Sequence, residues 1–235
     1  MLVHISIGIS RCLLGDEVRY DGKNKYSSIC CEQLASYYKL VPVCPEVEAG
    51  LTIPRPAIEL IQDTNDLFIK GRDDKSLDVT HRLTTFSGHK VSTLAYLSGY
   101  VLTPRSPSCG VHSVTVKSPL GDILKHGENG VFTQELIQQF PSLPIIEEPD
   151  LTDKSTLDEF EILVMMYHII QRDYLTKCIK DSHANVRKFI LKINELTTTH
   201  KQMEQVTTLL EGESFQRLHR LKVELRDCVS SLTLM

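Results

Sequence analysis

Three of the seven cysteines in the chain stand where an apolar, strand-like run ends and a turn begins. They are Cys12 in SRCLLG, Cys44 in VPVCPEVEAG and Cys109 in RSPSCG. Thiolates bind both zinc and iron–sulfur clusters, and three of them without an obvious fourth leave one coordination position open, as in catalytic metal centres. We therefore expect the three cysteines to form one metal site. Their spacing fits either an iron–sulfur cluster or a zinc site with three cysteine ligands, with His112 as the nearest candidate for a further ligand.

Two carboxylates follow the second of these cysteines. Glu46 lies two residues after Cys44, and in an extended segment both side chains would point to the same side. A carboxylate in that place could transfer protons near a bound substrate. Glu48 shares the same parity, and the alternative for both residues is a solvated acid on a loop.

Other polar residues flank the expected site. Ser106 and Ser108 surround a proline just before the third cysteine and could donate hydrogen bonds to a ligand, although serines also serve to form turns. Arg55 lies between two prolines on a stiff segment, where its guanidinium could bind an anionic or carbonyl group of a substrate. Asp21 in RYDG is a further candidate for substrate binding, and its alternative role is to start a turn.

The composition narrows the class of protein. With 41% hydrophobic and 24% charged residues, the 235-residue chain is typical of a globular protein rather than a disordered or fibrous one. Its apolar stretches fall short of the roughly 20 residues that cross a membrane, and no leader-like segment is expected, which favours the cytoplasm. Because the cytoplasm keeps thiols reduced, we expect thiols or metal ligands rather than disulfides. Four cysteines lie in helical patterns and are expected to pack in the core: Cys30, Cys31, Cys178 and Cys228.

Apolar patterning predicts alternating strands and helices over the first part of the chain. The strand-like segments are 2–10, 40–44, 66–70, 100–104, 113–117 and 143–148, with 66–70 at a sheet edge. The helical segments are 28–40, 76–99 and 130–140, of which the second begins near Asp78 and is interrupted at Gly88. This order is expected of parallel crossovers in a layered α/β fold. Ligands of such sheets bind at the carboxyl ends of the strands, so the topology would bring the three cysteine loops together.

From about Asp150 onward proline disappears and apolar residues recur every three or four positions, as in helices. We therefore predict an α/β protein with two domains. Residues 1–149 form a layered, Rossmann-like or flavodoxin-like domain with a mainly parallel sheet, and residues 150–235 form an all-α domain.

The blocks GISRCLLGDEVRYDG, VCPEVEAGLTIPRPAIEL and SPSCG, in this order, resemble the signature blocks of the thiouracil desulfurase family. The resemblance spans about residues 3–148. It implies a compact α/β domain in which Cys12, Cys44 and Cys109 hold a [4Fe–4S] cluster with one iron not bound by protein. It also implies that Glu46 is the catalytic acid, and that Ser106, with Ser108 as a close second, is the catalytic serine.

The activity implied by this resemblance is a desulfuration without net redox change. The open iron would take the sulfur of a thiolated pyrimidine, as free base or nucleoside, and water would replace it to give the oxo form and sulfide. The chain departs from the family pattern at two positions that could alter the substrate pocket, Asn24 where histidine is common and Glu59 where extended members often carry arginine. An alternative is a sulfur-trafficking or redox-sensing protein whose cluster performs no turnover.

The segment LPIIEEPDLTDKSTLDEFEILVMMYHIIQRDY and the block SHANVRKFI resemble family members that carry a helical extension of unknown function. Thiolated tRNA is a further candidate substrate. The helical extension could bind RNA through four basic residues, Arg217, Arg220, Lys222 and Arg226, although such a cluster is more often a solvated helix face. The formal net charge of −4 gives no general basic excess for nucleic-acid binding.

Overall fold

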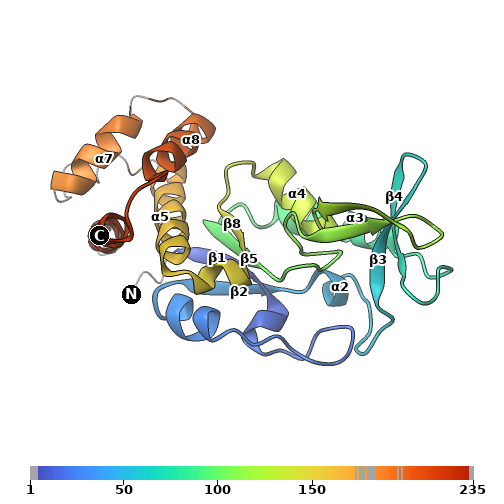
Figure 1. The fold of residues 1–235 in the computed structure, drawn as a ribbon. Helices are drawn as coiled ribbons and strands as arrows, with labels where there is room; N and C mark the ends of the chain where they lie inside the picture. The colour runs from blue at the N-terminus through green and yellow to red at the C-terminus, as the bar shows by residue number, and fades with distance from the viewer. Residues whose placement is uncertain are drawn as a thin grey trace.

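The computed structural model describes residues 5–172, 174, 178, 184–194, 196 and 198–232. The strands of this part of the chain form two four-stranded sheets. Helices cover them, and further helices follow at the carboxyl-terminal end of the chain (Figure 1).

The first sheet is parallel throughout. It consists of β1 (Ser6–Ser10), β2 (Lys39–Val43), β5 (Gly99–Leu102) and β8 (Ile145–Glu147) in the order β2-β1-β5-β8. β1 and β5 are buried along their whole length, which explains their nearly continuous apolar sequences. Numbered within this sheet alone, the order is 2-1-3-4, which is that of flavodoxin-like folds. The predicted α/β fold with a mainly parallel sheet is therefore confirmed.

The second sheet stands beside the first and mixes parallel with antiparallel pairs. Its strands are β3 (Ile58–Asp63), β4 (Asp66–Gly71), β6 (Val114–Lys117) and β7 (Ile123–Glu128), in the order β4-β3-β6-β7. The sequence predicted β6 and the edge strand β4. It missed β7, whose residues are almost all exposed and therefore lack an apolar alternation, and β3, which follows a proline-rich segment.

Short helical turns and two longer helices connect these strands. They are η1 (Arg11–Leu14), the π-helix η2 (Ile29–Leu34), α1 (Ala35–Tyr37), α2 (Pro45–Glu48), α3 (Thr80–Ser92) and α4 (Val131–Gln139). α3 begins near Asp78 as predicted, because that carboxylate accepts a hydrogen bond of 2.9 Å from the backbone N–H of Thr80. The predicted interruption at Gly88 is wrong. A single glycine costs a helix only about 1 kcal/mol, and α3 continues through it.

Beyond β8, the described residues form helices and short connections, as predicted. The helices are η3 (Glu148–Thr152), α5 (Lys154–Gln171), α7 (Ala184–Asn194), α8 (Thr199–Leu210) and α9 (Phe215–Leu232). α5 packs against both α8 and α9. It also packs on the parallel sheet, where a Cβ added to Gly99 of β5 would lie 2.6 Å from the side chain of Val164.

One apolar core runs through both the parallel sheet and these helices, from Ile5 to Leu232. Figure 1 shows α5 standing between the sheet and the other carboxyl-terminal helices. The division into domains at residues 149 and 150 stays a prediction, and the packing of α5 makes the two parts share their interior.

The cations of α9 are held by carboxylates. Buried Lys222 pairs with Asp158 and, at 3.1 Å, with Glu161 of α5, and Arg226 also pairs with Glu161. The guanidinium of Arg226 lies 3.7 Å from the centre of the Tyr37 ring. The two exposed cations pair along the chain, Arg217 with Glu213 at 2.9 Å and Arg220 with Glu224 at 2.9 Å. Two of the four cations considered for RNA binding, Lys222 and Arg226, are therefore turned into the protein, and the four do not form one solvated helix face.

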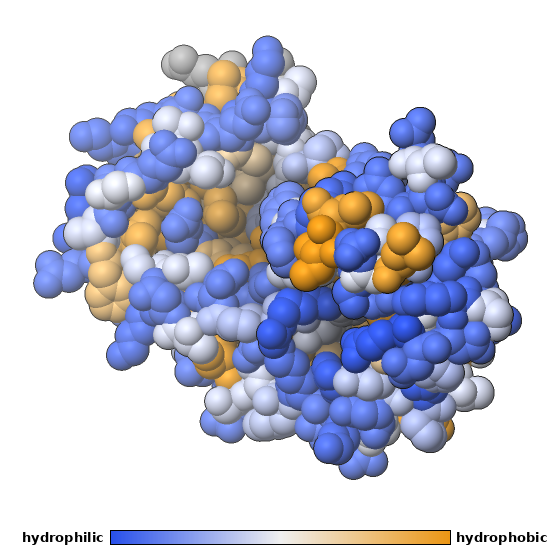
Figure 2. Space-filling model, turned by 45° about the vertical axis from the view of Figure 1, so that its right-hand side comes forward, coloured by the Kyte–Doolittle hydropathy of each residue, from blue (hydrophilic) through white to orange (hydrophobic). Residues whose placement is uncertain are grey.

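In the part of the chain that the structure describes, no helix is both long and apolar enough to cross a bilayer. The face drawn in Figure 2 is mostly hydrophilic, and its hydrophobic residues gather in separate patches.

Candidate active site

The three predicted ligand cysteines meet at the carboxyl edge of the parallel sheet. Cys12 lies in η1 directly after β1, Cys44 follows β2, and Cys109 lies in the loop after β5. Since β2, β1 and β5 are parallel neighbours, their ends open to the same edge. All three cysteines line one cavity of about 500 Å³.

Backbone contacts fix the first two cysteine loops. The carbonyl of Cys12 accepts hydrogen bonds from the N–H groups of Lys25 at 2.9 Å and Gly15 at 3.3 Å, and Gly15 has a left-handed φ of 95° that turns the chain there. Cys44 is the N-cap residue of α2, and its N–H donates to the carboxylate of Glu48 at 2.9 Å. The thiol of Cys44 lies 3.8 Å from the carbonyl oxygen of Val18.

The amino-terminal end of α4 holds the third loop. The N–H of Phe132 donates to the carbonyl of Ser108 at 3.0 Å, and the hydroxyl of Thr133 donates to the carbonyl of Cys109 at 2.8 Å. The two segments are so close that a Cβ on Gly130 would lie 2.4 Å from the carbonyl carbon of Ser108. A side chain at Gly130 would therefore push the Cys109 loop out of the cavity wall.

The three thiols are buried or partly buried. Cys12 and Cys109 are 7% and 5% exposed, and Cys44 is partly buried. Burial raises the pKa of Cys12 and of Cys44, and it raises the pKa of Cys109 well above its usual value. The charges of ionised Cys44 and Cys12 would raise the pKa of Cys109 further, so the three sulfurs are within electrostatic reach of one another. Since metals bind the thiolate, loading this site must release protons.

The donor set is chemically suited to an iron–sulfur cluster, because three cysteine thiols line one cavity and such clusters are held by cysteine thiolates. The buried hydroxyl of Thr103 lines the same cavity and faces the thiol of Cys12, where its hydrogen bond acts to lower the pKa of that thiol against the larger effect of burial.

His112 does not belong to this site. It is exposed, it does not line the cavity, and its backbone N–H donates to the side chain of Asn129 at 2.9 Å. The fourth-ligand candidate of the sequence therefore stays a solvated loop histidine.

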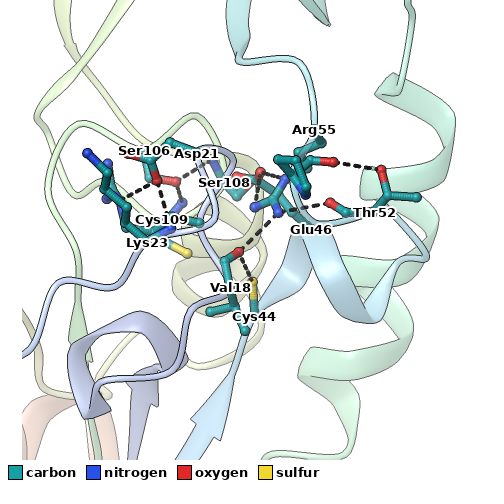
Figure 3. A network of polar contacts seen from close by, with 12 residues as sticks. Val18, Asp21, Lys23, Cys44, Glu46, Thr52, Arg55, Ser106, Ser108 and Cys109 are labelled. Atoms are coloured by element: carbon teal, nitrogen blue, oxygen red, sulfur yellow. Dashed lines mark hydrogen bonds and ion pairs between the residues drawn. The ribbon is translucent and has the colours of Figure 1, made fainter.

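Glu46 reaches the cavity from a helical turn and not, as predicted, from an extended segment. The helix separates it from Glu48, whose carboxylate caps Cys44 and pairs with Lys90 at 2.8 Å. Glu46 accepts hydrogen bonds from Arg55 at 2.7 Å and from the hydroxyl of Ser108 at 3.0 Å (Figure 3). The shared parity of the two acids was therefore misleading, and only Glu46 lines the cavity.

The two candidate serines occupy different positions. Ser106 lines the cavity, and its hydroxyl oxygen accepts the N–H groups of Ser108 and Cys109, each at 3.2 Å. Its own hydroxyl proton has no acceptor among the described residues, so it is available to a ligand. Ser108 is only 1% exposed and donates to Glu46. Ser106 can thus touch a ligand, whereas Ser108 contacts the carboxylate.

The two candidate substrate-binding residues also line the cavity. Asp21 forms a turn, because its carboxylate accepts the N–H of Lys23 at 3.2 Å, and it also lies 3.6 Å from the guanidinium of Arg19. Arg55 gives its N–H groups to protein oxygens, among them the carbonyl of Val18 at 3.0 Å.

A strongly cationic lining went unnoticed in the sequence. The cavity wall carries two carboxylates, Asp21 and Glu46, against seven cationic side chains: Arg11, Arg19, Lys23, Lys25, Arg55, Arg72 and Arg105. Four of these come from the segment around and after the first cysteine, SRCLLGDEVRYDGKNKY, and this density of cations was the available signal. Tyr20 lies at the rim between two guanidinium groups, at 5.6 Å from Arg19 and 6.0 Å from Arg72. The site is locally basic in a chain whose formal net charge is −4.

The two departures from the family pattern differ in position. Asn24, which stands where the family commonly has histidine, lines the cavity and can therefore affect the substrate pocket. Glu59 does not line the cavity and instead pairs with Lys75 and, at 2.8 Å, with Lys117 on the second sheet.

The chain is similar to known proteins in sequence and in fold. The family model of 2-thiouracil desulfurase matches residues 7–148, which is more than half of the chain. The uncharacterized protein YbbK of Bacillus subtilis (strain 168) is 33% identical over 116 residues, covering 43% of this chain and 71% of YbbK. The solved structure of a [4Fe–4S]-dependent thiouracil desulfidase, TudS, matches with a TM-score of 0.50 and 26% identity, covering 63% of this chain and 93% of TudS. By its sequence blocks, its fold and this match, the chain belongs to the 2-thiouracil desulfurase family.

Proposed function

We propose that this protein removes sulfur from thiolated pyrimidines in the cytoplasm, converting the thiocarbonyl to a carbonyl and releasing sulfide. The observation that carries the proposal is the convergence of Cys12, Cys44 and Cys109 with Glu46 on one cavity at the carboxyl edge of the parallel sheet. Membership of the 2-thiouracil desulfurase family and the likeness to a [4Fe–4S]-dependent desulfidase support it.

Cys12, Cys44 and Cys109 would hold a [4Fe–4S] cluster through three of its irons. When bound, the cluster supplies an open iron that acts as a soft Lewis acid toward the sulfur of the substrate. The protein contributes three thiolates from three loops that share one sheet edge, and the buried hydroxyl of Thr103 lies within the same cavity.

Glu46 is the residue placed to move protons. Its carboxylate lines the cavity, so it can take a proton from water as the water oxygen adds to the thiocarbonyl carbon, and return it as the carbon–sulfur bond breaks. The sum is one water consumed and one hydrogen sulfide formed, with no change in oxidation state. Ser108 orients one carboxylate oxygen, and the free hydroxyl proton of Ser106 can bind a heteroatom of the pyrimidine ring.

The lining charge favours an anionic substrate over a neutral base. Within the described residues, no carboxylate forms an ion pair with Lys23, Lys25, Arg72 or Arg105, although all four line the cavity. Unpaired cations in a concave site bind phosphate strongly. A thiolated nucleotide, whether free or within an RNA strand, presents a phosphate beside the base, and a free thiouracil does not.

The test uses protein reconstituted with iron and sulfide without oxygen, then incubated with three substrates. These are 4-thiouracil, 4-thiouridine 5′-monophosphate and an RNA that contains 4-thiouridine. We expect sulfide release and loss of thiocarbonyl absorbance, with kcat/KM higher for the phosphorylated substrates than for the base. The ratio between the last two substrates tells a free nucleotide from RNA. A loaded cluster that releases no sulfide from any of them would refute the proposal and favour the sulfur-trafficking or redox-sensing alternative.

A further inference from the structure

We propose that Arg55 is a positioning residue that fixes the carboxylate of Glu46 for proton transfer, and that it does not bind the substrate. This inference rests on the desulfuration proposed above. It assigns to Arg55 a role different from the one its stiff, proline-flanked sequence suggested.

The side chains of Arg55 and Glu46 form an ion pair that is almost fully buried. The Nε and Nη2 atoms of Arg55 each lie 2.7 Å from Oε2 of Glu46, and the two side chains are only 5% and 12% exposed. Ser108 takes the other carboxylate oxygen, Oε1, at 3.0 Å. Each oxygen of Glu46 thus has its own fixed donor, so the carboxylate cannot rotate without breaking a charge-assisted hydrogen bond.

Two backbone carbonyl groups also hold the guanidinium of Arg55. Its Nη1 atom donates to the carbonyl oxygens of Val18 at 3.0 Å and Thr52 at 3.3 Å. With the hydrogen bond from Nε and the ion-pair contact of Nη2 to Glu46, every nitrogen of the guanidinium has a protein partner. Arg55 therefore has its orientation set before any substrate arrives and has little capacity left to bind one.

The carbonyl of Val18 lies between Arg55 and the loop of Cys44. Its oxygen accepts Nη1 of Arg55 at 3.0 Å and lies 3.8 Å from Sγ of Cys44 (Figure 3). Glu46 lies two residues beyond Cys44 on the same helical turn. Arg55 thus aligns the carboxylate relative to the loop that carries Cys44, which is what a proton-transfer group beside a sulfur-binding centre needs.

Other cations of the cavity are placed differently. The guanidinium of Arg72 lies 6.0 Å from the ring of Tyr20, and no carboxylate of the described chain pairs with it. Residues such as Arg72 can bind an anionic group of the substrate. The cavity therefore keeps cations for substrate binding although Arg55 is paired with Glu46.

The experiment combines single and double variants of the reconstituted holoenzyme with neutral 4-thiouracil as substrate. We expect Arg55→Met to lower kcat roughly 10- to 100-fold while KM changes less than about threefold, because a loosened group loses transition-state stabilisation rather than substrate affinity. Arg55→Lys should recover only a small part of kcat, since an ammonium cannot replace the planar fork. The double variant Arg55→Met with Glu46→Gln should be no slower than Glu46→Gln alone, because Arg55 acts through Glu46.

Arg226→Met is the matched control, because it also removes a buried arginine from a glutamate but lies outside the cavity. Its kcat per bound cluster should stay unchanged. The assignment is overturned by a rise in KM at constant kcat for Arg55→Met, by multiplicative losses in the double variant, or by loss of iron from Arg55→Met that Glu46→Gln does not share.

A second readout needs no turnover. In iron-free protein, the falls in Tm caused by Arg55→Met and Glu46→Gln should be non-additive in the double variant, because both remove one contact. Additive falls would overturn the pairing. Wild-type protein that binds iron but releases no sulfide would refute the proposed function, and the thermal comparison would still decide whether Arg55 and Glu46 act as a pair.

Discussion

The cavity and the carboxyl-terminal helices both carry clusters of cations, and the two clusters are built in opposite ways. On α9, Lys222 and Arg226 are turned inward onto Asp158 and Glu161, and each cation of the cluster is paired. In the cavity, three of the seven cationic side chains are paired with carboxylates, and no carboxylate among the described residues pairs with the other four, Lys23, Lys25, Arg72 and Arg105. Paired cations hold elements of the fold together, whereas unpaired cations in a concave site are available to an anion.

The contrast explains why a basic run of sequence is a poor guide to binding. Arg217, Arg220, Lys222 and Arg226 are closely spaced on one helix and look like a patch, yet carboxylate partners on α5, within α9 and just before it neutralise them. Four of the cavity cations come from the segment around and after Cys12, and the fold adds Arg55, Arg72 and Arg105 from other parts of the chain.

The largest expected effect concerns the thiols of the cavity. Cys44→Ala should abolish cluster assembly and lower sulfide release more than about 1,000-fold, because the cluster loses one of its three protein ligands. Cys228→Ala, which removes a buried thiol among the helices, should keep the full iron content. Iron and sulfide analysis after anaerobic reconstitution measures both. An intact cluster in Cys44→Ala would mean that the metal site lies elsewhere.

Next in size is the loss of the proton-transfer group. Glu46→Gln should retain the cluster and lower kcat about 100- to 10,000-fold, as removal of a general acid or base does. Glu48→Gln is its matched control two residues away, where the carboxylate caps a helix and pairs with Lys90. Steady-state rates per bound cluster test the pair, and equal losses in the two variants would contradict the assignment.

The unpaired cavity cations should matter for charged substrates only. Arg72→Met should raise KM for 4-thiouridine 5′-monophosphate about tenfold, equivalent to about 1.4 kcal/mol, and leave KM for neutral 4-thiouracil nearly unchanged. Initial rates over a range of substrate concentrations provide the comparison. An equal rise for both substrates would place Arg72 against the base rather than a phosphate.

The paired cations of the helices should affect stability instead. Lys222→Met leaves Asp158 and Glu161 buried with less compensation, which costs about 3–5 kcal/mol and lowers Tm by about 10 °C. Arg220→Met removes an exposed pair and should cost less than about 1 kcal/mol. Thermal unfolding compares the two variants. A loss of turnover per bound cluster in Lys222→Met, without a lower Tm, would show that the helical cations act in function and not in stability.

The smallest expected effect is a pH-dependent change in stability at the cluster of Glu59, Lys75 and Lys117. Burial acts to raise the pKa of Glu59, but Lys117 and Lys75 outweigh it and hold that pKa below its usual value. The folded state thus gains stability from ionised Glu59 above the unfolded pKa of about 4.3, and loses it as pH falls through the lower folded pKa. Glu59→Gln should lower Tm by on the order of 2 °C at pH 7, and the difference from wild type should vanish on acidification. A difference that grows toward low pH would contradict this account.

The sequence predicted those parts of the molecule that depend on buried pattern and local turn chemistry. The cysteine loops could be placed at one edge because β1 and β5 are buried along their length and therefore read as apolar runs. β7 could not be found in the same way, since it is exposed, and the pairing of Arg55 with Glu46 joins residues nine positions apart through a turn that no periodicity encodes. The extended geometry expected at Glu46 failed because Pro45 starts a helical turn there.

The most direct test of the account is sulfide release by anaerobically reconstituted wild-type protein, compared with Cys44→Ala, on 4-thiouridine 5′-monophosphate. The account predicts one sulfide for each thiocarbonyl lost in the wild type and none above background in the variant. Sulfide release that persists in Cys44→Ala, or a wild-type protein with a full iron content and no sulfide release, would contradict it.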